Sequence, residues 1–134
     1  MLLGTDIASV LTTLTALGVD AVGLNCSTGP EDMRDAIRFL GENSPVPISC
    51  IPNAGIPHQG LNGETIFPEE PEPLARMLGE FVDRYGVGIV GGCCGTSSAI
   101  RTQSVPSNSS MLKISPSIEG ESSTTTMISV CGFR

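Results

Sequence analysis

The residues with the clearest chemical potential are two adjacent cysteines, Cys93 and Cys94, which follow a short apolar run and two glycines. The run Val87–Val90 predicts a buried strand, because apolar residues occupy both of its faces. The glycines allow a sharp backbone turn, and Thr96 or Ser97 can cap a following helix. Thiols near the positive end of a helix are favoured as thiolates. The pattern therefore predicts a metal site at the carboxyl end of a β-strand.

A vicinal cysteine pair can also exist without a metal. Two thiols buried as small apolar groups, or a strained disulfide, fit the same residues, and the C-x-x-C spacing of zinc motifs is absent. A third thiol, Cys26, follows the predicted strand Ala21–Asn25, and Asn53 follows the predicted strand Val46–Ile51. The carboxyl ends of parallel strands meet at one edge, where ligands bind. Three thiols that arrive there from two strands favour metal binding.

The remaining cysteines and the single histidine are not expected to join this site. Cys50 lies within a predicted strand, Cys131 lies in the tail as a free thiol, and His58 lies in a loop without a second histidine to assist it. An odd number of cysteines, five, in a chain without a signal-peptide pattern indicates thiols or metal rather than a disulfide framework. This usage predicts a cytoplasmic location.

The elements that must position these residues alternate along the chain. The alternation of helix and strand predicts an α/β fold with parallel strands and right-handed crossovers. A long loop, Ile56–Pro73, is expected to have a function or to cover a site. Apolar spacing, caps and glycine stops predict helices at Thr5–Leu17, Pro30–Leu40 and Leu74–Tyr85, with strands at Ala21–Asn25, Val46–Ile51 and Val87–Gly91.

Size and composition restrict the organisation and the partners of the chain. Its 134 residues with a net charge of −7 predict at most one domain, and the acidic balance argues against nucleic-acid or membrane partners. No window approaches the length of a membrane span. Residues 101–134 are dominated by Ser and Thr, which predicts a low-complexity, disordered or irregular tail or linker after a domain at 1–100.

Three motifs carry a resemblance to a known family. They are Gly23–Pro30 (GLNCSTGP), Ile51–Gly55 (IPNAG) and Gly91–Thr96 (GGCCGT). With the opening Leu3–Ala8 (LGTDIA), they resemble the homocysteine S-methyltransferase family, and most closely the homocysteine-binding module of its cobalamin-dependent methionine synthase branch. The resemblance covers about residues 1–100.

This resemblance implies a (β/α)8 TIM barrel, of which the chain carries the C-terminal part, about three βα units. It implies that Cys26, Cys93 and Cys94 hold Zn²⁺, with Asn53 as an exchangeable neighbour. Three thiolates with one open position form a catalytic type of zinc site. Homocysteine would bind there through its sulfur and accept a methyl group to give methionine, with no side chain as nucleophile. In the full-length enzyme the donor would be methylcobalamin, and cobalamin and folate modules would be partners.

The first half of that barrel has no counterpart in this chain. We therefore expect a fragment of a longer enzyme, unstable by itself and with little turnover, because the strands that orient the substrate are missing. One alternative is an inactive zinc-binding remnant. Another is a thiol-redox protein that uses Cys93 and Cys94, which reversible oxidation without metal would reveal.

Overall fold

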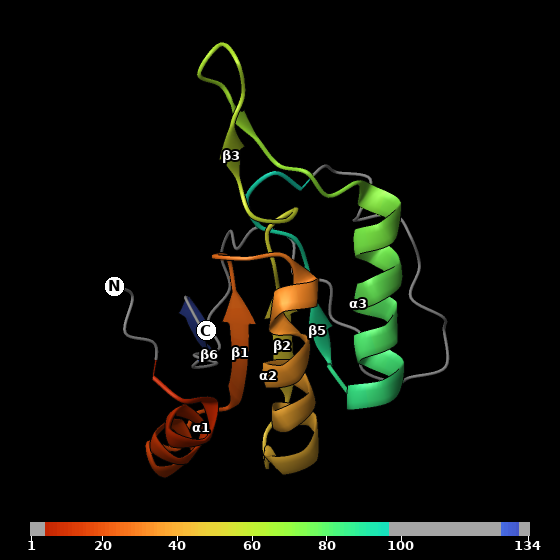
Figure 1. Cartoon of the computed structure of the whole chain (residues 1–134). Coiled ribbons are helices and arrows are strands. Elements are labelled where there is room, and N and C mark those ends of the chain that lie inside the picture. The colour runs from red at the N-terminus through yellow and green to blue at the C-terminus, as the bar shows by residue number, and fades with distance from the viewer. Residues whose placement is uncertain (1–4, 97–126, 132–134) are drawn as a thin grey trace, which may run out of the picture.

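The chain folds into a mixed α/β arrangement around one parallel sheet. The computed structural model describes residues 5–96 and 127–131. In order along the chain, the elements are α1 (Ile7–Ala16), β1 (Ala21–Asn25), α2 (Pro30–Asn43), β2 (Ile48–Ile51), β3 (His58–Gln59), β4 (Thr65–Ile66), α3 (Pro71–Tyr85), β5 (Ile89–Val90) and β6 (Met127–Cys131) (Figure 1).

The main sheet has the strand order β5-β2-β1-β6, and every pair in it is parallel. The parallel pairing predicted for the strands at β1, β2 and β5 is confirmed. β2 begins two residues later than predicted, at Ile48. Pro47 before it has no N–H to donate to the ladder, and its carbonyl instead accepts from the Val22 amide at 3.0 Å. β5 is likewise shorter than predicted, with only Ile89 and Val90 paired to β2.

The helices begin and end at residues with recognisable capping chemistry. The carboxylate of Asp6 accepts from the Ser9 amide at 3.2 Å and caps α1. α2 begins at Pro30 and runs to Asn43, three residues past Leu40, where the predicted helix stopped. α3 begins at Pro71, three residues before the predicted start, because proline is tolerated in a first turn whose amides need no helical partner.

Helices α2 and α3 lie side by side against one face of the sheet (Figure 1). Val22, Leu24 and Cys50 are buried in one core with the helical residues Ile37, Leu74 and Phe81. Burial of these apolar side chains fixes the sheet to its helical layer.

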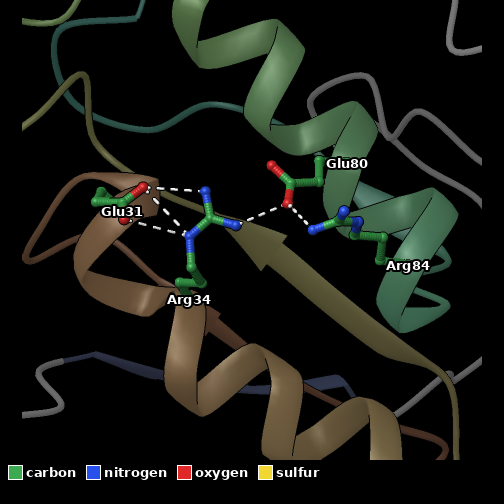
Figure 2. Close-up of polar contacts among 4 residues, drawn as sticks. All are labelled: Glu31, Arg34, Glu80 and Arg84. Atoms are coloured by element: carbon green, nitrogen blue, oxygen red, sulfur yellow. Dashed lines mark hydrogen bonds and ion pairs between the residues drawn. The ribbon is translucent and has the colours of Figure 1, made fainter.

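An ion pair also joins the two helices to each other. Figure 2 shows Arg34 of α2 between Glu31 of its own helix and Glu80 of α3, with Nη1 of Arg34 2.9 Å from Oε1 of Glu80.

Two segments differ from their predictions. The predicted loop Ile56–Pro73 contains the antiparallel hairpin β3–β4, which projects beyond the carboxyl end of the sheet (Figure 1). The prediction of an irregular tail is wrong for Met127–Cys131, which forms β6 and pairs with the edge of β1. That edge carries backbone donors and acceptors that require partners. The rest of the tail and the helix predicted after Thr96 lie outside the described residues.

No helix in the described part of the chain is long and apolar enough to cross a membrane.

Candidate metal centre

Three loops meet at the carboxyl end of the parallel strands. Backbone hydrogen bonds join them: the amide of Cys26 donates to Ile51 O (2.9 Å), and that of Cys93 donates to Pro52 O (2.8 Å). The amide of Ala54 donates to Cys94 O at 2.9 Å. The loop after β2 therefore lies between the two cysteine-bearing loops and connects both of them.

Asn53 is the main connector within this middle loop. It is 5% exposed. Its backbone N–H donates to Thr28 O at 3.0 Å, and its side-chain Oδ1 accepts from the backbone N–H of Cys94 at 3.2 Å. Asn53 thus fixes the loop after β1 through its backbone and the loop after β5 through its buried side chain.

Cys26 has an unusual backbone conformation. Its φ is +56° and that of Ser27 is +64°, both in the left-handed region that non-glycine residues rarely adopt. The amide of Thr28 donates back to Cys26 O at 2.7 Å and closes this tight turn. Strained backbone of this kind persists where the surroundings over-determine it, and it is frequent at functional sites.

The sulfurs of Cys26, Cys93 and Cys94 converge, as the sequence predicts. All three lie within 4.8 Å of one another, and the sulfurs of Cys93 and Cys94 are 3.9 Å apart. Zinc–sulfur bonds of about 2.3 Å in a tetrahedron place sulfurs about 3.8 Å apart. The cluster therefore fits a zinc ion after a contraction of about 1 Å or less. Cys26 and Cys93 are half-buried and Cys94 is exposed, so the site is accessible from solvent.

The protonation of Cys93 differs from the sequence expectation. Burial, followed by the neighbouring thiols of Cys26 and Cys94, raises the pKa of Cys93 to about 12. The expectation that its position favours a thiolate rests on a helix after Thr96 that lies outside the described residues, and burial within the cluster acts in the opposite direction. Once one thiol of the cluster is ionised, a second negative charge beside it is disfavoured unless a cation is present. A high pKa also makes Cys93 a poor redox nucleophile at neutral pH.

The hairpin is attached to this site at its base. Gly95 has a φ of +77°, and the ring of Phe67 occupies the space that a side chain at Gly95 would need. The amide of Glu69 donates to Ala54 O at 3.0 Å. Burial, with the charges of Glu31 and Asp32, raises the pKa of the Glu69 carboxyl. The segment after β4 thus packs on the turn that holds Cys93 and Cys94.

The other residues considered from the sequence lie elsewhere. Cys50 is fully buried within β2, and burial raises the pKa of its thiol to about 12. His58 is exposed on β3, and the side chain of Cys131 is not described. Asn25 was not singled out from the sequence, yet its Nδ2 donates to the Cys26 sulfur at 3.3 Å. Its place before Cys26 was the only available signal.

Comparisons with known proteins agree with the geometry. A sequence model of the family described as homocysteine S-methyltransferase matches residues 1–101. Methionine synthase of Mycobacterium tuberculosis (strain ATCC 25618 / H37Rv) is 46% identical over 99 residues, which are 74% of this chain. Methionine synthase of Mycobacterium leprae (strain TN) is 44% identical over 97 residues, or 72% of the chain. The matched region spans 8% of the length of each relative.

Proposed function

Because the chain belongs to the homocysteine S-methyltransferase family, we propose that it carries the zinc-binding part of an enzyme that methylates the thiol of homocysteine to give methionine. The observation that carries this proposal is the convergence of the Cys26, Cys93 and Cys94 sulfurs within 4.8 Å. The parallel strands and the helical layer on one face support its place in the C-terminal part of a (β/α)8 barrel.

Cys26, Cys93 and Cys94 would hold the zinc ion. The chemistry that zinc supplies at such a site is stabilisation of a substrate thiol as a nucleophilic thiolate at neutral pH. The residues of this chain contribute binding and orientation. Asn53 connects the two cysteine loops, and the left-handed turn at Cys26 carries the third sulfur. No side chain of the cluster is required as the nucleophile, since the substrate sulfur accepts the methyl group.

We propose methylcobalamin as the methyl donor, and cobalamin and folate modules as partners in a longer polypeptide. The similarity to methionine synthases supports this choice. The chain spans only 8% of those proteins. Binding of zinc and of the substrate sulfur is therefore the property of this chain to test first, and turnover by the chain alone is expected to be low.

The test measures zinc content and the Co²⁺ spectrum of the purified chain before and after addition of homocysteine. We expect about one zinc per chain and a stronger sulfur-to-cobalt charge-transfer band with homocysteine, because a fourth sulfur joins three. Cys93→Ser should abolish stoichiometric zinc binding. Cys50→Ser, a cysteine variant outside the cluster, should retain it. Equal zinc binding by both variants would contradict the proposed site.

A further inference from the structure

The side chain of Asn25 touches the metal cluster although it is not one of its sulfurs. Asn25 is the last residue of β1 and is half-buried. Its position is fixed by the ladder, where it pairs in register with Ile51 of β2 and with Cys131 of β6. From there its Nδ2 donates to the Cys26 sulfur at 3.3 Å. A rigid strand thus presents an amide donor to a sulfur in the adjacent loop.

The backbone of Cys26 is anchored to Ile51 O, but this contact does not set the direction of its sulfur. Cys93 and Cys94 are adjacent, and their backbone is anchored by Pro52, Asn53 and Ala54. Cys26 comes alone from the opposite loop, and it lies in a left-handed turn with Ser27. A short side chain on such a turn has several rotamers, of which few direct the sulfur at the pair. A hydrogen bond to the sulfur selects among these rotamers before the metal arrives.

The chemistry of the contact also suits a metal ligand. A thiolate can only accept hydrogen bonds, and the carboxamide of Asn25 offers an uncharged N–H. Three thiolates around one divalent cation carry an excess negative charge, and N–H donors to the sulfurs spread that charge. Hydrogen bonds of this kind orient metal ligands and adjust their basicity.

We infer that Asn25 is a positioning residue for the metal: its amide holds the Cys26 sulfur toward those of Cys93 and Cys94 and withdraws charge from it. This inference rests on the proposed zinc site. It assigns to Asn25 a role different from that of Asn53, which contacts the backbone of Cys94 rather than a sulfur.

The test compares zinc affinity in two variants, measured by competition with a chelating dye. Asn25→Leu keeps the approximate volume and removes the donor, and we expect its zinc Kd to rise about 10- to 100-fold. Asn25→Asp keeps the shape and places a carboxylate against the sulfur, so its Kd should rise at least as much. Asn62→Asp makes the same charge change in the exposed hairpin connection and should leave the Kd within about twofold of wild type.

A second readout separates positioning from a general loss of stability. An N–H donor lowers the energy of the sulfur lone pair, so its loss should move the sulfur-to-Co²⁺ charge-transfer band to longer wavelength. Val22→Ala, which loosens the core packing of the same strand, should lower the thermal midpoint without moving this band. If Asn25→Leu fails to fold, the zinc Kd and the charge-transfer band of the isosteric Asn25→Asp variant decide whether Asn25 positions the sulfur.

Each outcome has a distinct meaning. An unchanged Kd and an unmoved band in the folded Asn25 variants would overturn the inference while leaving the zinc site intact. A wild-type chain that takes up no zinc would overturn the proposed function, and the inference with it.

Discussion

Cys50 shows how strongly its surroundings determine the behaviour of a thiol in this chain. It is fully buried in the core within β2, whereas the three clustered cysteines lie in loops at the end of the sheet. Burial raises the pKa of Cys50 to about 12. The same residue type thus serves as an apolar core group inside the sheet and as a candidate ligand at its carboxyl end.

A pH prediction follows for Cys50. Its pKa is higher in the folded protein than in the unfolded chain, so the folded state retains a proton that the unfolded state releases. The contribution of this thiol to stability is complete below about pH 8.5 and is lost at about 1.4 kcal/mol per pH unit as the pH rises toward 12. Urea unfolding of the reduced, metal-free chain between pH 8 and 10 measures the slope.

Cys50→Ala should have a shallower alkaline decline than wild type, although the cavity lowers its stability at every pH. Val22→Ala, another core truncation in the same sheet, should keep the wild-type slope. Parallel declines in all three proteins would show that Cys50 ionises as readily in the folded state as in the unfolded chain.

At the scale of elements, the contact between α2 and α3 combines an apolar core with a charged bridge. Arg34 contacts Glu31 and Glu80, Glu80 also contacts Arg84, and the Arg34 guanidinium lies 5.5 Å from the centroid of the Phe81 ring. Figure 2 shows these four charged side chains directed toward one another between the helices. Arg34 and Glu80 are about one-third exposed, so solvent weakens this bridge only in part.

We predict that Arg34→Ala lowers the free energy of unfolding by about 1–2 kcal/mol, because it removes both ion pairs and the ring contact. The hydrogen bond from Arg34 holds the pKa of Glu80 below its usual range. The bridge therefore stabilises the fold above about pH 4.3 and is lost as the pH falls through the lowered pKa.

Chemical denaturation of wild type and Arg34→Ala at pH 7 and pH 3 tests this, and the two should differ less at pH 3. Arg76→Ala removes an exposed arginine whose ion pair with Glu72 spans 3.6 Å, and it should change stability by less than about 0.5 kcal/mol. An equal effect of both substitutions would mean that the bridge between helices adds nothing.

The hairpin base supplies a second prediction at this scale. Gly95→Ala places a methyl group where the Phe67 ring lies and imposes a left-handed conformation on alanine. We expect the turn carrying Cys93 and Cys94 to shift and the zinc Kd to rise about tenfold, as a cost of about 1–2 kcal/mol implies.

Gly63→Ala is a matched control, since Gly63 has a similar φ of +82° with nothing within 4 Å of the added methyl group. It should leave zinc binding unchanged. Truncation of the ring, Phe67→Ala, should restore part of the affinity in the Gly95→Ala background. Failure of that rescue would assign the effect to backbone strain alone.

The order of the helices and of strands β1, β2 and β5 could be predicted from the sequence, because apolar spacing, proline starts and glycine stops are local signals. The β3–β4 hairpin was missed, because its strands have two residues each, too few to show an alternating pattern. The convergence of three sulfurs followed from the rule that parallel strands end at one edge. The contact between the Asn25 side chain and the Cys26 sulfur depends on side-chain rotamers, which the adjacency of the two residues in the sequence does not determine.

At the scale of the whole molecule, the feature that sequence patterns missed is the position of β6. Ala21 pairs with Met127, and the ladder continues to Asn25 and Cys131. A pairing so distant in sequence depends on which edge is open in three dimensions. The apolar residues around Ser129 in Met127–Cys131 are compatible with a short strand, but the strand with which it pairs cannot be read from composition.

We predict that deletion of Met127–Cys131 increases self-association, because the backbone groups along β1 lose their partners. Light scattering and size-exclusion chromatography at several concentrations measure this. Deletion of residues 107–111 shortens the chain equally and should leave the oligomeric state unchanged. A monodisperse protein after removal of β6 would show that the edge of β1 is protected by other means.

The placement of β6 beside β1 also has a consequence for biosynthesis. The neighbours of β1 are Ile48–Ile51, which soon follow it from the ribosome, and Met127–Cys131, which come much later. When this chain is synthesised by itself, at translation rates of about 5–20 residues per second, the second edge of β1 has no partner from the chain for on the order of 5–20 s. During that interval a nascent chain has a ready template for strand addition, which makes it a natural client for chaperones that shield open sheet edges.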